Sequence, residues 1–235
     1  MEKENESNKI DEVKEDQIIE DAFQHLLKTY LASPHRKKVD IITKAYHFAK
    51  QAHKGVRRLS GEPYILHPIA VAQIACEEIG LGSTSICSAL LHDVVEDTDY
   101  TVEDIENIFG AKVAMIVDGL TKISGGIFGD KASAQAENFK KLLLTMSDDI
   151  RVILLKICDR LHNMRTLKYM REDKRHRIAK ETLEVYAPLA NRLGISNIKV
   201  ELEDLCLRYL EPEAYYALVE EVKHKRQERQ DFIRE

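Results

Sequence analysis

Two histidines and several carboxylates stand in separate short phrases of this 235-residue chain, and together they have the chemistry of a metal site. The phrases are His67-Pro68, His92-Asp93, Glu96-Asp97 and Asp159-Arg-Leu-His-Asn-Met. Imidazole nitrogens and carboxylate oxygens without thiolate suit Mn²⁺, Fe²⁺, Zn²⁺ or Co²⁺. The acidic pair follows the His-Asp pair by about one helical turn, where it could activate a water molecule. The set predicts metal-assisted hydrolysis.

A helix expected over 84–97 would carry the His-Asp pair. At 100° per residue, His92, Asp93, Glu96 and Asp97 share one arc of about 140°, opposite the apolar residues. A solvated helix face would give the same pattern. However, 83–97 contains no Lys or Arg, and neighbouring carboxylates repel one another without a cation. The pattern therefore favours a metal over a solvated face.

A second helix, expected over 149–168, would carry Asp159. The residues before Asp159 are mostly apolar, so this carboxylate is predicted to be buried and to need a partner. The partner could be a basic neighbour, Lys156 or Arg160, or a metal ion, and the pattern leaves both open. Asn163 and Thr166 follow at helical spacing and share the Asp159 face within about 60°.

Helices must position all of these residues, because the apolar spacing is helical nearly everywhere and no long alternating run predicts a strand. Pro68 suits the first turn of a helix, with His67 at its N-terminal boundary. Thr101 and Asp104 form a predicted capping box. Further helices are expected over 18–30, 41–52, 111–120, 136–146, 174–186 and 197–209. The glycine-rich stretch 124–133 is predicted to be a mobile loop that could gate the site.

Composition narrows the class of protein. The net charge of −5 argues against a broadly basic surface for direct nucleic acid binding. The four cysteines form no CxxC pair and are expected to be buried and reduced. No stretch approaches the ~18 consecutive apolar residues of a membrane span, and no N-terminal leader is visible, so a cytoplasmic protein without membrane attachment is expected.

Longer phrases resemble the hydrolase domain of the RelA/SpoT homologues, within the HD phosphohydrolase superfamily. The resemblance covers roughly residues 40–215. The matching phrases are Ser60-Gly-Glu-Pro-Tyr-Ile-Leu-His-Pro68, Leu91-His-Asp-Val-Val-Glu-Asp-Thr98, Val117-Asp-Gly-Leu-Thr-Lys122, Asp149-Ile-Arg-Val-Ile-Leu-Leu-Lys156, Asp159-Arg-Leu-His-Asn-Met-Arg-Thr-Leu167 and Tyr186-Ala-Pro-Leu-Ala-Asn-Arg-Leu-Gly194.

The resemblance implies an all-α HD-domain phosphohydrolase fold and Mn²⁺-dependent hydrolysis of the 3′-pyrophosphate of guanosine tetraphosphate and pentaphosphate. It assigns roles to residues as follows: His67, His92, Asp93 and Asp159 as ligands of one Mn²⁺, Glu96 and Asp97 as the catalytic acidic pair, and Arg58, Ser60, Tyr64, Asn163 and Thr166 as substrate-binding residues. One position departs from the family pattern: Leu59 stands where a second basic residue is common. This puts substrate affinity or preference in question.

The resemblance also implies a domain organisation. Composition predicts a disordered acidic N-terminus at 1–15, because that stretch is highly charged. The resemblance implies the alarmone hydrolase domain at 16–196. It also implies a helical connector at 197–235, because the tail resembles the segment that leads into a synthetase domain, absent here. Two other functions stay open: HD-type hydrolysis of other nucleotides, and a catalytically silent domain that regulates such a synthetase. The second would be expected to lack a ligand, yet all of them are present.

Overall fold

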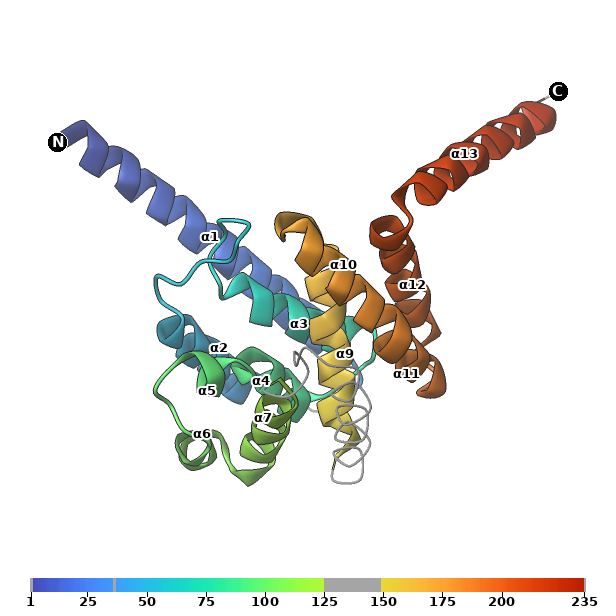
Figure 1. Ribbon diagram of the computed structural model, residues 1–235. Helices are drawn as coiled ribbons and strands as arrows, with labels where there is room; N and C mark the ends of the chain where they lie inside the picture. The colour runs from blue at the N-terminus through green and yellow to red at the C-terminus, as the bar shows by residue number, and fades with distance from the viewer. Residues whose placement is uncertain (1, 36, 125–148, 235) are drawn as a thin grey trace. The chain divides into compact units, whose positions relative to one another are not determined.

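The computed structural model describes residues 2–35, 37–124 and 149–234. It divides into two compact units, Met1–His162 and Asn163–Glu235, which Figure 1 draws in one colour series from blue to red. Every named element of the described residues is helical, and their one β-bridge joins Arg57 to Pro63. The predicted all-α class is confirmed. Within the described residues, no helix combines the length and apolar character needed to span a bilayer.

The first unit consists of helices of different lengths around an apolar core. Its helices are α1 (Glu2–Ala32), α2 (Val39–Ala52), α3 (Leu66–Glu77), α4 (Ser83–Leu91), α5 (Val94–Asp97), α6 (Val102–Phe109), α7 (Ala111–Ser124) and most of α9 (Ile150–Arg165). The central helix is α4, which packs against α2, α3 and α7, while α1 packs on α3 and α6 on α7 (Figure 1). All its residues from Ser85 to Leu91 are buried. The packing around α4 positions the residues that follow it.

Several local predictions hold. The capping box before α6 is confirmed, since the Thr101 hydroxyl accepts from the Asp104 backbone N–H and the Asp104 carboxylate accepts from the Thr101 backbone N–H. Helix α3 begins at Leu66, which puts His67 in its first turn. The four cysteines are free and buried, and burial raises the pKa of the Cys87 thiol to about 12.

One predicted helix is wrong. The continuous helix over 84–97 is broken, because α4 ends at Leu91 and a turn at His92-Asp93 precedes the short α5. The apolar spacing continues across the break, with Leu90 and Val94 both fully buried, so the pattern alone does not reveal it. The backbone of Asp93, at φ −97° and ψ −6°, leaves the regular helical region there.

The second unit consists of the end of α9 and the helices that follow it. They are η1 (Leu167–Tyr169), α10 (Glu172–Glu181), η2 (Thr182–Tyr186), α11 (Ala187–Arg192), α12 (Ser196–Leu210) and α13 (Pro212–Arg234). Helix α12 packs against α10, η2 and α11. The helix predicted over 174–186 is not continuous. Helix α10 ends at Glu181, and the residues of η2 form a π-helical turn. The predicted domain boundary at 196 lies inside this unit.

Two predictions concern the N-terminus and the glycine-rich segment. Helix α1 includes most of the stretch 1–15, for which composition alone predicts disorder. The predicted loop at 124–133, apart from Ser124, and the helix predicted over 136–146 lie outside the described residues.

Candidate metal and active site

Three of the predicted metal ligands meet in one buried cluster of the first unit. The ligand atoms of His67, His92 and Asp159 all lie within 4.8 Å of one another. They come from α3, from the turn after α4 and from α9, so the fold joins three distant parts of the chain. None of the three residues is more than 7% exposed. A cluster this closely spaced and this deeply buried has the donor set of a transition-metal site.

The fourth predicted ligand, Asp93, lies beside this cluster. Its Oδ2 atom is 2.9 Å from His92 Nε2 and 3.6 Å from His67 Nε2. Despite the short distance, His92 Nε2 has no hydrogen bond of acceptable geometry among the described residues, although it is buried. A buried ring nitrogen without a hydrogen bond is costly unless another ligand uses its lone pair. The four residues therefore fit a bound metal ion.

Helix and turn geometry orients the two imidazoles. His92 Nδ1 lies 2.7 Å from the Ala89 carbonyl oxygen, which can only accept, so Nδ1 donates. In the neutral ring this leaves the lone pair on Nε2, the atom that faces the carboxylates. His67 presents Nε2 as well, at 3.3 Å from Asp159 Oδ1. Both rings thus offer the same kind of nitrogen to the cluster.

Burial and the neighbouring charges shift the pKa values of the two imidazoles in opposite directions. Burial lowers the pKa of His67 and so favours the neutral imidazole that a metal requires. Burial has the same effect on His92, but the charges of Asp93 and Asp159 outweigh it and raise the pKa of His92 to about 9. Burial alone would raise the pKa of Asp159, yet Lys156 and the two imidazoles hold it well below its usual range. The same imidazoles lower the pKa of Asp93.

The contacts of Asp159 show a basic partner, Lys156, and are also compatible with a metal ion, the two alternatives that the sequence left open. Its Oδ2 atom lies 3.1 Å from Lys156 Nζ, and its Oδ1 atom faces the imidazoles, at 3.3 Å from His67 Nε2 and 3.9 Å from His92 Nε2. The basic neighbour therefore takes one oxygen and leaves the other directed into the cluster. A buried carboxylate held by an ammonium in this way keeps its negative charge and a fixed orientation.

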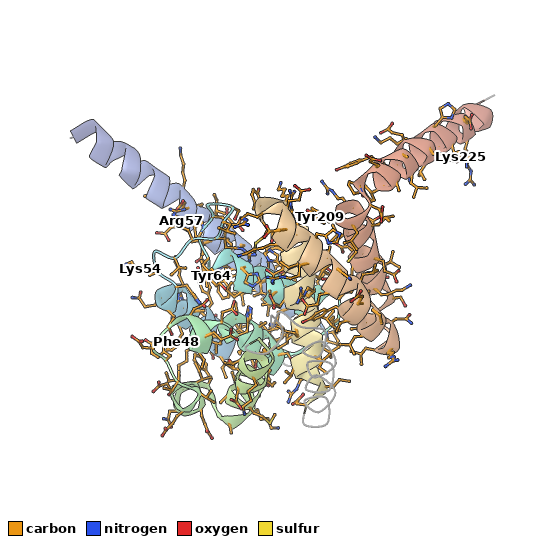
Figure 2. The ribbon with its side chains drawn as sticks, viewed as in Figure 1. Phe48, Lys54, Arg57, Tyr64, Tyr209 and Lys225 are labelled. Carbon is orange, nitrogen blue, oxygen red and sulfur yellow. The ribbon has the colours of Figure 1, made fainter. Side chains whose placement is uncertain are left out.

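The loop before α3 carries three of the predicted substrate-binding residues. A tight turn, in which the Gly61 N–H donates to the Arg58 carbonyl at 2.9 Å and Gly61 adopts φ +87°, holds Ser60. The Ser60 hydroxyl is buried and has no hydrogen-bond partner among the described residues. Arg57 anchors the loop to α1 through two 2.8 Å hydrogen bonds to Glu15 (Figure 2). Leu59 is 72% exposed at the tip.

Tyr64, at the end of this loop, has a contact that the sequence does not predict. Its hydroxyl donates a 2.6 Å hydrogen bond to Asp93 Oδ2, and its ring stacks on His53 at 4.8 Å (Figure 2 labels Tyr64). The bond reaches from the substrate loop to a candidate metal ligand. The predicted role of Tyr64 at the guanosine stays a prediction.

The predicted acidic pair lies on α5 and is exposed, unlike the cluster. Asp97 Oδ2 lies 3.8 Å from Nε2 of the buried His53. Partial burial, together with the negative charge of Asp93, raises the pKa of Asp97 above its usual value. A carboxylate with a raised pKa is better suited to accept a proton near neutral pH.

The last two predicted residues belong to the second unit. Asn163 stands one turn after Asp159 on α9, and Thr166 follows the end of that helix. The Thr166 hydroxyl lies 3.3 Å from the Asn163 carbonyl oxygen, so the two residues are neighbours. Their predicted role with the nucleotide stays a prediction.

Sequence reasoning missed His162. Its Nδ1 atom lies 2.7 Å from His67 Nδ1 and 3.5 Å from Arg58 Nη1. A signal for it exists, because it follows Asp159 by three residues and so lies near the same helix face. The contact with His67, however, depends on tertiary packing between segments 95 residues apart.

Comparisons with known proteins identify the family of this chain. The HD domain family model matches residues 45–196. The guanosine-3′,5′-bis(diphosphate) 3′-pyrophosphohydrolase of Vibrio cholerae and the bifunctional (p)ppGpp synthase/hydrolase SpoT of Escherichia coli are each 49% identical over 213 residues, covering 91% of this chain and 30% of the relative. A GTP pyrophosphokinase of Myxococcus xanthus is 51% identical over 200 residues, which cover 83% of this chain and 26% of the relative.

The chain thus spans 26–30% of the length of these curated relatives. A solved structure, titled as a metazoan orthologue of SpoT that hydrolyses ppGpp, matches with a TM-score of 0.58 and 24% identity, covering 74% of this chain and 97% of that one. At that identity the match shows the fold alone. The predicted resemblance to the RelA/SpoT homologues is confirmed by the sequence relatives. With the family model matching well over half of its length, the chain belongs to the HD domain family.

Proposed function

We propose that this chain is a divalent-metal-dependent hydrolase that removes the 3′-pyrophosphate of guanosine tetraphosphate and pentaphosphate. The observation that carries the proposal is the buried cluster of His67, His92 and Asp159, whose ligand atoms lie within 4.8 Å of one another. The names of the relatives that are 49% identical support the substrate class. The chain spans only part of these relatives, so the activity of a full-length protein that contains it is also a proposal.

The metal would be held by His67, His92, Asp93 and Asp159, and we propose Mn²⁺ as the ion. When bound, such an ion lowers the pKa of water and polarises a phosphoryl group. The residues supply the rest of the site: two imidazoles, of which His67 has a lowered pKa, two carboxylates with lowered pKa values, and little exposure to bulk water. Two nitrogens and two oxygens suit Mn²⁺ but leave other first-row metals to be tested.

Glu96 and Asp97 would orient the attacking water and accept its proton. The water oxygen forms a bond to the phosphorus attached to the ribose 3′ oxygen, and the 3′ oxygen–phosphorus bond breaks. Pyrophosphate is released, the 3′ oxygen takes up a proton, and GDP or GTP is the other product. The raised pKa of Asp97 supports a role as the proton acceptor, with Glu96 orienting the water.

The remaining residues would hold the nucleotide. Arg58 is suited to stack on a purine and to hydrogen-bond at the same time, because its guanidinium is planar. Ser60 has a buried hydroxyl that lacks a hydrogen-bond partner among the described residues, as expected of a group that awaits a ligand. Asn163 and Thr166 would contact the ribose and phosphate side, and Tyr64 would complete the guanosine site.

The direct test is turnover of guanosine tetraphosphate by the purified chain, with Mn²⁺ and with a chelator, scoring GDP and pyrophosphate. Release of both products only with metal is the expected result. A panel of ordinary nucleotides in the same assay would expose an HD-type hydrolase of another substrate. A chain that binds metal but turns over none of these nucleotides would instead be a silent regulatory domain.

The wider organisation also belongs to this proposal. We propose that the domain bounded near residues 15 and 196 works within a longer protein that carries a synthetase domain, with 197–235 as the connector. The relatives, of which this chain covers 26–30%, are consistent with a longer protein. A location in the cytoplasm stays a prediction.

A further inference from the structure

His162 contacts a candidate metal ligand without being a ligand itself. Its Nδ1 atom lies 2.7 Å from His67 Nδ1, and the two rings are tilted by 40° with centroids 4.9 Å apart. His67 is almost fully buried and His162 is partly buried. At this distance one nitrogen must carry a proton and the other a lone pair. The protonation pattern of one ring therefore determines that of the other.

The metal decides which nitrogen donates. His67 points Nε2 at Asp159 Oδ1, 3.3 Å away, so Nε2 must keep its lone pair when a metal is bound there. The single proton of neutral His67 is then on Nδ1 and is donated to His162 Nδ1. His162 in turn must carry its own proton on Nε2. Only this pair of tautomers satisfies both the metal and the 2.7 Å contact.

Without metal, the opposite pair of tautomers fits the same geometry. A proton on His67 Nε2 can be donated to Asp159, and His67 Nδ1 then accepts from a proton on His162 Nδ1. Each ring keeps one proton in both states, so the number of protons on the pair does not change. Metal binding would thus change the tautomer of both rings at once.

His92 provides an internal contrast. Its Nδ1 faces the Ala89 carbonyl oxygen at 2.7 Å, and a carbonyl oxygen accepts but never donates. The Nδ1 proton of His92 is therefore fixed whether or not metal is present. Of the two candidate imidazole ligands, only His67 depends on a partner whose own tautomer can change.

The second neighbour of His162 does not compete strongly for the same lone pair. Arg58 Nη1 lies 3.5 Å from His162 Nδ1, and a guanidinium can only donate. His67 is 0.8 Å closer than Arg58 to this atom, so the His67 N–H is the favoured donor in the metal-bound state. His162 nevertheless joins a metal ligand to the loop proposed to hold the substrate.

We propose that His162 is a positioning residue of the metal site, which accepts the His67 Nδ1 proton and so directs the His67 Nε2 lone pair at the metal. The inference rests on the proposed function, because it requires a metal ion at the cluster. Loss of a group that orients a metal ligand typically lowers metal affinity about 10–100-fold. The same loss is expected here.

The first test compares two substitutions at this position. His162→Leu removes the acceptor, and we expect the Mn²⁺ affinity measured by calorimetry to fall by about 10–100-fold. His162→Asn keeps an oxygen near the position of Nδ1 and should restore the affinity to within about threefold of the unaltered chain, since hydrogen bonding to His67 is regained. His176→Leu, the same change at an exposed histidine of α10, should leave the affinity unchanged.

A second measurement keeps the inference testable if His162→Leu fails to fold. Nitrogen-15 NMR of the unaltered chain, with and without diamagnetic Zn²⁺, reports which ring nitrogen carries each proton. We expect the proton of His67 to move from Nε2 to Nδ1 on metal binding and that of His162 to move from Nδ1 to Nε2. His92 should keep its Nδ1 proton. A metal-loaded chain with the His162 proton on Nδ1, or a Leu variant with unchanged affinity, overturns the inference. An unaltered chain that binds no metal overturns the proposed function as well.

Discussion

His92, in the candidate metal cluster, and the acidic pair are only a few residues apart in the chain, yet their surroundings differ sharply. His92 is 4% exposed and lies among the other candidate ligands, whereas Glu96 and Asp97 are exposed on α5. The break between α4 and α5 separates these two environments. The difference indicates that the ligand geometry is built by the fold in advance, while the residues that meet water stay open to it.

The largest effect is expected inside the cluster. Asp159→Ala removes the oxygen that faces both imidazoles and leaves Lys156 buried without this carboxylate. We expect Mn²⁺ affinity to fall by more than about 100-fold and turnover to be lost. Metal content after dialysis and the guanosine tetraphosphate assay would measure this. Asp173→Ala, at an exposed residue of α10 paired with Arg171, is the control. A metal-free variant that stays active would refute the site.

Changes to the acidic pair should separate chemistry from metal binding. Glu96→Ala and Asp97→Asn leave the four candidate ligands in place, so Mn²⁺ affinity should stay within about threefold of the unaltered chain, whereas kcat should fall by about 10²–10⁴-fold. Calorimetry and steady-state kinetics on the same preparations measure the two quantities. If metal affinity fell together with kcat, the acidic pair would belong to the cluster and the contrast would disappear.

Tyr64 connects the two environments, so its hydroxyl tests where the boundary lies. Tyr64→Phe removes the 2.6 Å hydrogen bond to Asp93 but keeps the ring that stacks on His53. We expect Mn²⁺ affinity to fall about tenfold with little change in KM, because the lost group orients a ligand. Tyr46→Phe is the matched control, because it removes a tyrosine hydroxyl that donates a hydrogen bond to Glu20 in α1. A raised KM with unchanged metal affinity would instead show that the Tyr64 hydroxyl, and not its ring alone, contacts the nucleotide.

The smallest effect is expected at the exposed tip of the substrate loop. Leu59→Lys adds the second basic residue that is common in the RelA/SpoT homologues, at a position that is 72% exposed. An exposed charge pair contributes about 0.2–1 kcal/mol, so KM should fall by no more than about fivefold. The gain should vanish at 1 M salt, where the Debye length is about 3 Å. Leu59→Gln, polar but neutral, should leave KM unchanged at both salt concentrations.

Local patterns in the sequence predicted much of this architecture. The Thr101 capping box, the position of His67 in the first turn of α3 and the helix over 196–210 all depend on neighbours within a few residues. Such signals are readable because capping and amphipathic spacing act locally. The ligand set was accessible for a related reason, since its residue types are unusual together even though they are distant in sequence.

The features that the sequence did not reveal depend on contacts between distant segments. The turn at His92-Asp93 interrupts a stretch whose apolar spacing continues, and the Asp93 carboxylate there accepts a hydrogen bond from Tyr64, 29 residues earlier. His162 reaches His67 across 95 residues. Periodicity carries no information about such pairs, because it describes one element at a time.

The ammonium of Lys156 has a consequence for the choice of ion. Because it contacts Oδ2 of Asp159, Oδ1 is the oxygen that faces the imidazoles, and this arrangement would favour coordination of a metal through one oxygen. Calcium prefers six to eight oxygen ligands and often takes both oxygens of a carboxylate. A site with two imidazole nitrogens and a carboxylate that coordinates through one oxygen disfavours calcium. Lys156, through its contact with Asp159, would thus help the site to select against one of the commonest divalent cations.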